Sequence, residues 1–199
     1  MPNKVVAFDI CPANQLLNVL ANQLGLEYDE DGKIAAQGTV DKALLTAMNA
    51  ADFYKKSYPK SLDNAWGGKH LLSLIENNPE KIPSHLRTIV EHIAYQIAQS
   101  IQQVLEKEAH SKASYTLLAT GGGAFNVFLM ERLQAHCTPL KVKVVIPEAP
   151  IIQFKEAILM AWMGVLRMEE VPNVMKTVTG ASRDTVGGSI SLGWRKSPR

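Results

Sequence analysis

Three consecutive glycines, Gly121, Gly122 and Gly123, stand between an apolar run and an amphipathic segment. Without side chains the backbone can turn sharply there, and its N–H groups can come close to a ligand. A helix expected from about residue 126 would add partial positive charge, which suits a phosphate. Asn126 is expected either to cap that helix or to contact the ligand. Since the glycines match neither the P-loop nor the GxGxxG pattern, a plain tight turn remains the alternative.

Two acidic residues are candidates for proton transfer. Asp9 directly follows the apolar run "VVAF", where a carboxylate could accept a proton from water or a hydroxyl, or hold a metal ion. Its structural alternative is to accept hydrogen bonds in the turn before Pro12. Glu156 opens a segment expected to form a largely buried helix, because residues 157–166 carry no charge. It is either an exposed residue favoured by the helix dipole or an acid that faces a cleft.

Other reactive residue types form no recognisable pattern. Cys11 and Cys137 show neither CxxC nor Cys/His metal spacing, and the five histidines are scattered without a Ser or Cys partner. We therefore assign no metal ion to protein side chains. A net charge of +2, without a basic cluster interleaved with aromatic residues, argues against nucleic acid as a partner. No run of 18 apolar residues and no signal peptide is present, so neither a membrane nor export is expected, and the predicted location is the cytoplasm.

The elements that must position these residues alternate between strand and helix in the second half of the chain. Strands are expected at 4–10, 114–120 and 141–147, with a weak candidate at 188–194, and helices at 12–24 (capped by Gly25), 42–56, 84–109 (with Ser84 as N-cap), 126–136 and 153–170. Residues 27–38 and 57–68 are expected to be loops. This order predicts an α/β fold with a parallel or mixed sheet covered by helices. The glycines and both acids fall at strand ends or helix starts, where such folds bind ligands.

Several segments, in order, resemble the anhydro-N-acetylmuramic acid kinases, which belong to the actin-like, sugar-kinase and Hsp70 ATPase superfamily. They are "FDICPANQLLN", "YDEDGKIAAQG", "PKS", "ATGGGAFNVFLMERL", "FKEAILMAWMGVL" and "VTGAS", and they extend from about residue 7 to 193. The resemblance implies a ribonuclease H-like (actin-like ATPase) C-terminal lobe with a mixed sheet covered by helices. It also implies a helical insertion at about 26–110 and a nucleotide-binding part with the glycine turn at about 111–194.

The resemblance further implies a reaction. Such kinases open 1,6-anhydro-N-acetylmuramic acid with water and phosphorylate the freed 6-oxygen from ATP and Mg²⁺, giving N-acetylmuramic acid 6-phosphate in peptidoglycan recycling. By this resemblance Asp9 is the base that activates water, and Glu156 is a second active-site acid. Gly121, Gly122, Gly123 and Asn126 correspond to nucleotide contacts, and Asn14 to a substrate contact.

The chain also departs from the family pattern. Residues 9–14 read DICPAN where the family commonly has Asp-x-Gly-Pro-Gly-Asn, and residues 59–63 read PKSLD where Thr-Gly usually follows Pro-Lys-Ser. Nothing resembles the Gly-Thr-Ser-x-Asp-Gly phosphate loop, or the two strands that precede the first expected strand. We therefore expect no turnover by this chain alone, and completion by a missing N-terminal lobe or by a second copy in a homo-oligomer. The alternatives are a non-catalytic nucleotide- or sugar-binding module, one subunit of a split kinase, and an α/β protein with a structural glycine turn.

Overall fold

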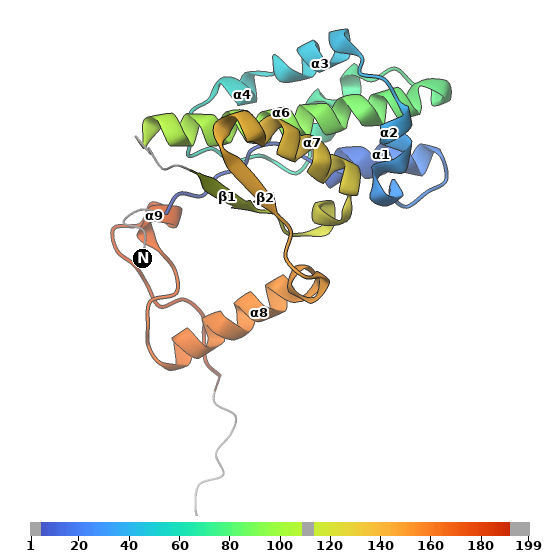
Figure 1. The fold of residues 1–199 in the computed structure, drawn as a ribbon. Coiled ribbons are helices and arrows are strands. Elements are labelled where there is room, and N and C mark those ends of the chain that lie inside the picture. The colour runs from blue at the N-terminus through green and yellow to red at the C-terminus, as the bar shows by residue number, and fades with distance from the viewer. Residues whose placement is uncertain (1–4, 109–113, 192–199) are drawn as a thin grey trace, which may run out of the picture. The chain divides into compact units, whose positions relative to one another are not determined.

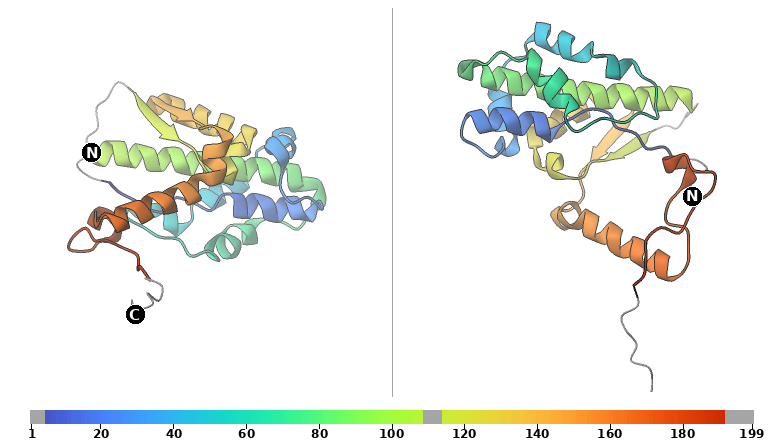
Figure 2. Two further views of the ribbon diagram at one scale, coloured as in Figure 1. Left: turned by 90° about the horizontal axis from the view of Figure 1, so that it is seen from below. Right: turned by 180° about the vertical axis from the view of Figure 1, so that it is seen from behind.

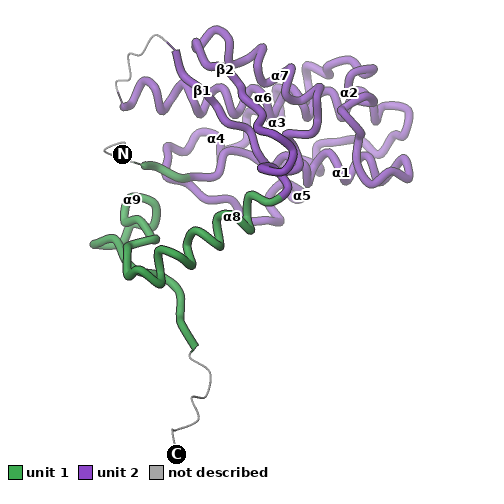
Figure 3. The backbone as a smooth tube through the Cα atoms, turned by 60° about the horizontal axis from the view of Figure 1, so that its bottom comes forward, with its two compact units in different colours: residues 1–7, 154–199 green, residues 8–153 purple. Residues whose placement is uncertain are grey.

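The fold is described from a computed structural model, which covers residues 5–108 and 114–191 (Figure 1). The chain divides into two compact units, residues 8–153 and residues 1–7 with 154–199, which we describe separately (Figure 3). Asp9, Asn14 and the glycine turn belong to the larger unit, and Glu156 belongs to the smaller one.

The larger unit is built around one long helix, α6. The helices in this unit are α1 (Asn14–Gln23), α2 (Lys33–Gln37), α3 (Lys42–Asn49), α4 (Asp52–Lys55), α5 (Trp66–His70), α6 (Ile82–Lys107) and α7 (Val127–Cys137), and the strands are β1 (Tyr115–Leu118) and β2 (Val142–Val145). The strands pair in parallel, with Tyr115 opposite Val142. Helix α6 packs against α1, α2, α3 and α7. Helices α3 and α4 lie on one side of α6 and the two strands on the other (Figures 1 and 2).

The apolar periodicity of α6 is confirmed. Leu86, Ile89, Val90 and Ile93 are fully buried in the core, each contributing about 1.5–3 kcal/mol by leaving water. The expected start was wrong, because the helix begins at Ile82 and Ser84 is not its N-cap. Proline at the second helical position explains this, since its fixed φ and missing N–H suit a first turn.

Several boundaries in the first half of the chain differ from expectation. The segment 27–38 is not only a loop, since the carboxylate of Asp29 accepts hydrogen bonds from the backbone of Ile34 and Ala35 and so holds the first turn of α2. The expected helix 42–56 is split into α3 and α4, and the expected loop 57–68 includes the start of α5. Two short helical turns, one at Glu30–Gly32 and one at Gly122–Phe125, complete the surroundings of the candidate site.

The expected strands have different outcomes. Strands β1 and β2 are confirmed, and with them the α/β class. Residues 5–10 form no strand, because Asp9 N–H is the one backbone donor there with a backbone acceptor, Lys60 O, within the described chain. Residues 188–191 form no strand either, and 192–194 lie outside the described residues. A single antiparallel bridge joins Val174 to Thr185 instead.

Helix α8 (Ala149–Met168) begins earlier than expected and is not buried as expected. Ile152 is its one buried side chain, whereas Trp162 is 59% exposed and Met168 69%. From Phe154 onwards it belongs to the smaller unit, whose described part contains α9 (Lys176–Thr179) but no strand ladder for an apolar helix to cover. By length and composition α8 could cross a bilayer, with a mean hydropathy of 1.3, but one such helix is weak evidence for a membrane span.

Candidate active site

The Asp9 carboxylate is held by one of its two oxygens. Oδ2 accepts hydrogen bonds from Leu62 N–H at 2.7 Å and from Ser61 Oγ at 3.1 Å, while Asp9 N–H donates to Lys60 O at 2.9 Å. Within the described residues no hydrogen bond reaches Oδ1. The carboxylate is therefore fixed in orientation and keeps an oxygen that is able to accept a proton.

A polar hollow of about 320 Å³ lies over Asp9. Its lining includes Asn14, Gln15, Asp63 and Asn64, so hydrogen-bonding groups surround the carboxylate. The volume is at the lower end of the roughly 300–1,000 Å³ typical of small-molecule sites. A small polar molecule with several hydroxyl or amide groups suits this lining.

The segment that carries Asp9 packs closely against α5. A Cβ on Gly67 would lie 2.9 Å from Pro12 Cγ, so glycine is needed for this approach. Cys11, next to Pro12, is half-buried, and burial raises the pKa of its thiol to about 12 although the nearby Lys60 charge acts in the opposite direction. The Cys11 thiol therefore stays protonated at neutral pH and is a poor nucleophile.

The glycine turn connects β1 to α7. Gly121 has a φ of +83°, which favours glycine, and Asn126 caps α7 by accepting a hydrogen bond from Leu129 N–H at 2.9 Å. Of the two roles expected for Asn126, the structure shows the helix cap, which its Oδ1 provides. No hydrogen bond within the described residues engages its Nδ2, which leaves a donor at the rim of a second hollow.

This second hollow, of about 460 Å³, lies beside the glycine turn. Gly122, Phe125 and Asn126 line it from the turn, and Asn14 lines it from α1. Asn14 also lines the Asp9 hollow, so this one side chain borders both. A Cβ on Gly122 would lie 3.0 Å from Asn14 Nδ2, and one on Gly123 would lie 3.1 Å from Asn14 Oδ1. The structure therefore brings Asp9, Asn14 and the glycine turn together.

Sequence reasoning missed part of this second hollow. Tyr28, Asp29, Glu30 and Asp31 also line it, although the sequence reads there as an acidic loop. Asp29 is occupied in holding α2, and the Asp31 carboxylate lies 2.9 Å from the Lys33 ammonium. The run of three acids before a glycine was the available signal, but nothing in it shows that it faces a turn ninety residues later.

Glu156 stands apart from this group. Because α8 begins at Ala149, Glu156 lies about two turns inside the helix and not on its first turn, so the dipole does not explain it. Its side chain is exposed, and it belongs to the smaller unit. Its role as a second acid is an expectation that the geometry of the larger unit does not address.

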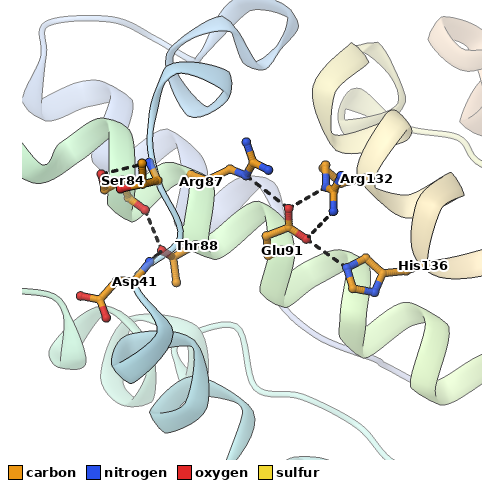
Figure 4. Close-up of polar contacts among 8 residues, drawn as sticks. Asp41, Ser84, Arg87, Thr88, Glu91, Arg132 and His136 are labelled. Carbon is orange, nitrogen blue, oxygen red and sulfur yellow. Dashed lines mark hydrogen bonds and ion pairs between the residues drawn. The ribbon is translucent and has the colours of Figure 1, made fainter.

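A different carboxylate, Glu91, is buried between α6 and α7 (Figure 4). Arg87 Nε and Arg132 Nε lie 3.2 and 2.6 Å from its Oε1, and Arg132 Nη2 and His136 Nε2 lie 3.3 and 3.0 Å from its Oε2. Burial alone would raise the pKa of Glu91, but the hydrogen bonds from His136 and Arg132 and both arginine charges lower it overall. With both oxygens occupied, Glu91 links two helices and is not available as a base.

No preformed metal site accompanies these residues. The described ranges hold no group of three His, Cys, Asp or Glu side chains placed to bind a metal ion.

Comparison with known proteins identifies the family. The family model described as anhydro-N-acetylmuramic acid kinase matches residues 1–193. Curated relatives with this name include proteins from Pseudomonas savastanoi (34% identical), Cupriavidus pinatubonensis (32%) and Shewanella oneidensis (30%), each match covering 94% of this chain. The chain spans about half the length of these relatives, 50%, 49% and 50% respectively. The chain belongs to the anhydro-N-acetylmuramic acid kinase family.

Proposed function

We propose that this chain supplies the base and the nucleotide-binding side of a kinase that acts on 1,6-anhydro-N-acetylmuramic acid. The product is N-acetylmuramic acid 6-phosphate, formed with ATP in peptidoglycan recycling. The single observation that carries the proposal is the pair of hollows that meet at Asn14, one holding Asp9 and the other the glycine turn. A phosphoryl transfer needs its acceptor and its donor in adjoining sites.

Asp9 acts as the general base in this proposal. Its free Oδ1 takes a proton from water as the water oxygen bonds to the anomeric carbon, and the bond from that carbon to the bridging 6-oxygen breaks. The freed 6-oxygen then attacks the γ-phosphorus of ATP, and ADP leaves. A positioned base contributes about 10²–10⁴-fold to such a step. The bonds from Ser61 and Leu62 keep Oδ2 in place while Oδ1 reacts.

The second hollow takes the nucleotide. The backbone of the glycine turn and the start of α7 offer N–H groups to phosphates, and the exposed Tyr28 and Phe125 rings offer apolar faces for a base. Glu30 and Asp31 can accept hydrogen bonds from sugar hydroxyls. Magnesium fits the site as an ion carried by the triphosphate, whose charge it neutralises.

Further parts of the proposal rest on family membership alone. They are a ribonuclease H-like, actin-like lobe with a helical insertion at about 26–110 and a nucleotide-binding part at about 111–194, a second acid at Glu156, Asn14 as a substrate contact, and a cytoplasmic location. Completion by an N-terminal lobe, or by a second copy in a homo-oligomer, belongs to the same proposal. The chain spans about half the length of these relatives.

The two hollows also fit one second candidate. The chain would then be a non-catalytic module, or one subunit of a split kinase, that binds nucleotide or sugar. This candidate uses both hollows but leaves Asp9 without a proton to accept. Binding and turnover must therefore be measured separately.

The test compares binding by the 199-residue chain with turnover by a complemented mixture. Calorimetry with ADP and with the anhydro sugar measures binding, and mass spectrometry of the sugar phosphate measures turnover. We expect turnover when the half of the Pseudomonas savastanoi relative that this chain does not match is added as a separate protein. Gly123→Val should abolish ADP binding, because its side chain displaces Asn14, whereas Gly68→Val, at a glycine with open space around it, should not.

The outcomes separate the candidates. Binding without turnover in the mixture favours the non-catalytic module. Failure of the chain to bind either ligand contradicts both candidates.

A further inference from the structure

Four polar side chains form a continuous hydrogen-bonded chain in the core of the larger unit. Tyr54 Oη lies 2.9 Å from His92 Nε2, and His92 Nδ1 lies 2.6 Å from Asn49 Oδ1. Gln96 Nε2 donates to the same Asn49 oxygen at 2.9 Å. His92 is fully buried, and Tyr54 and Gln96 are buried with it. Leaving one such group unpaired costs about 1–3 kcal/mol, so the four side chains hold one another in place.

The direction of each bond in this chain is defined. Asn49 Oδ1 can only accept, so His92 carries its proton on Nδ1 and donates it to Asn49. His92 Nε2 is then an acceptor and receives the hydroxyl proton of Tyr54. Burial lowers the pKa of His92 to about 4, which keeps the ring neutral in this tautomer at neutral pH.

Tyr54 connects the four hydrogen-bonded side chains to the segment that holds Asp9. Its neighbour in α4, Phe53, lies under the Lys60 ammonium, 4.5 Å from the ring centroid, and the Phe53 carbonyl accepts a hydrogen bond from that ammonium at 3.4 Å. The Lys60 carbonyl accepts the Asp9 N–H, and the two residues after Lys60 bind the Asp9 carboxylate. A connected series of contacts therefore runs from the core of α6 to the base.

Helix α4 is the link that most needs support. It has four residues and no side-chain cap, and a helix of this length has no stability of its own. Trp66 packs against both Phe53 and Tyr54, at 5.4 and 5.7 Å between ring centroids. Apolar packing keeps α4 against the core but is non-directional, whereas the Tyr54–His92 hydrogen bond fixes its distance and rotation.

We propose that Tyr54, His92 and Asn49 are positioning residues for Asp9, acting through α4 and Lys60. The proposal rests on the proposed function in one respect, the role of Asp9 as base. A misplacement of about 1 Å at a reacting group can cost about a hundredfold in rate. None of the three residues lines the hollow over Asp9.

The experiment uses Tyr54→Phe in the 199-residue chain, which removes one oxygen and keeps the ring. Amide hydrogen exchange is measured by NMR for Asp9 and Leu62, whose N–H groups hold the segment together. We expect exchange at both to accelerate about tenfold, the equivalent of one lost hydrogen bond. The Leu62 amide proton should also move upfield, as its 2.7 Å bond to a carboxylate loosens. Neither readout needs substrate, so the result stands whether or not the proposed function holds.

Three further variants make the result specific. Tyr95→Phe removes a hydroxyl from an exposed tyrosine on α6 and should change neither amide. Leu133→Ala weakens the core on α7 and should accelerate Asp9, Leu62 and Ala119, whose N–H pairs with Val145 O, by similar factors. Lys60→Met removes the contact between Lys60 and Phe53, outside the core, and should accelerate exchange at Asp9 and Leu62 as Tyr54→Phe does. It replaces Tyr54→Phe as the test if Tyr54→Phe folds poorly.

Two results overturn the proposal. One is unchanged exchange at Asp9 and Leu62 in both Tyr54→Phe and Lys60→Met. The other is acceleration in these variants that is equally large at Ala119, because a uniform effect reports general instability and not positioning. In the complemented kinase assay, a fall in kcat with an unchanged KM for the sugar is the matching kinetic result.

Discussion

Asp9 and Glu91 are carboxylates of the same unit in opposite situations. Asp9 lies at a hollow, is held through Oδ2 by two uncharged donors, and keeps Oδ1 free of hydrogen bonds from the described chain. Glu91 lies in the core with a cationic or histidine donor on each oxygen. The number of occupied oxygens, more than burial, separates a carboxylate that can accept a proton from one that cannot.

The two sites also differ in how they are built. The partners of Glu91 are one turn away on α6, or one turn apart on α7, so two helices in contact are sufficient to assemble the cluster (Figure 4). The partners of Asp9 lie more than fifty residues along the chain and come from a segment without regular structure. The Glu91 cluster depends on helix packing, and the Asp9 site depends on what holds its loops.

The largest expected effect is on turnover. Asp9→Asn keeps the shape and the Oδ atom that accepts hydrogen bonds but removes the proton acceptor, so kcat in the complemented assay should fall about 10²–10⁴-fold. Asp63→Asn is the matched control, since Asp63 lines the same hollow and its Oδ1 accepts a hydrogen bond from Ala65 N–H. Asp63→Asn should remain within about fivefold of wild type. Equal losses in both variants would remove Asp9 from the base role.

The second effect is on stability. Glu91→Gln leaves Arg87 and Arg132 facing an uncharged group in the core and should lower the free energy of unfolding by about 3 kcal/mol. Urea denaturation followed by circular dichroism measures this difference. Glu106→Gln, at an exposed position of the same helix, should change it by less than about 0.5 kcal/mol. Asp9→Asn should resemble Glu106→Gln in this assay, and a large loss there would make Asp9 a structural residue.

The third effect is a pH dependence of the difference in free energy of unfolding between wild type and Glu91→Gln. The pKa of Glu91 in the folded protein lies below its ordinary value of 4.5, so the unfolded chain takes up the proton first as the pH falls. The stability that Glu91 contributes is complete above about pH 4.5 and is lost as the pH falls through the folded value. The gap in urea midpoint between wild type and Glu91→Gln should therefore narrow from pH 7 to pH 3.

Comparing wild type with Glu91→Gln also removes the effect of a second titrating group, His92, on stability. His92 is buried and neutral, with its pKa lowered from 6.5 to about 4, so its own contribution fades as the pH falls through that interval. Because both proteins keep His92, this contribution cancels in the comparison. A gap that stays constant down to pH 3 would show that the Glu91 charge is not what stabilises the α6–α7 contact.

Local patterns were sufficient where a residue and its cause are close in sequence. The three- and four-residue spacing of apolar residues predicted α6, and a cap was one of the two roles expected for Asn126 because the helix it caps follows at once. Gly121 does adopt a positive φ, as a sharp turn requires. Each of these depends on interactions within about one helical turn.

Patterns failed where the cause is distant. The five-residue helix α2 has no periodicity to detect and depends on the side chain of Asp29. The apolar run in α8 predicted burial, but burial also needs a surface to cover, which composition does not encode. Asp9 stays a predicted base, and its hydrogen-bond partners at 61 and 62 were not predicted, because contacts more than fifty residues apart leave no local signal.

The position of Asn14 has a thermodynamic consequence. Its side chain is a wall of both hollows and is in close contact with the glycine turn, so a ligand that moves it in one hollow reshapes the other. Linkage then requires reciprocity. If bound nucleotide changes the affinity for sugar by some factor, bound sugar must change the affinity for nucleotide by the same factor. One amide side chain is thereby sufficient to couple the two binding steps, while the free energy of reaching the ternary complex stays the same for either order of ligand addition.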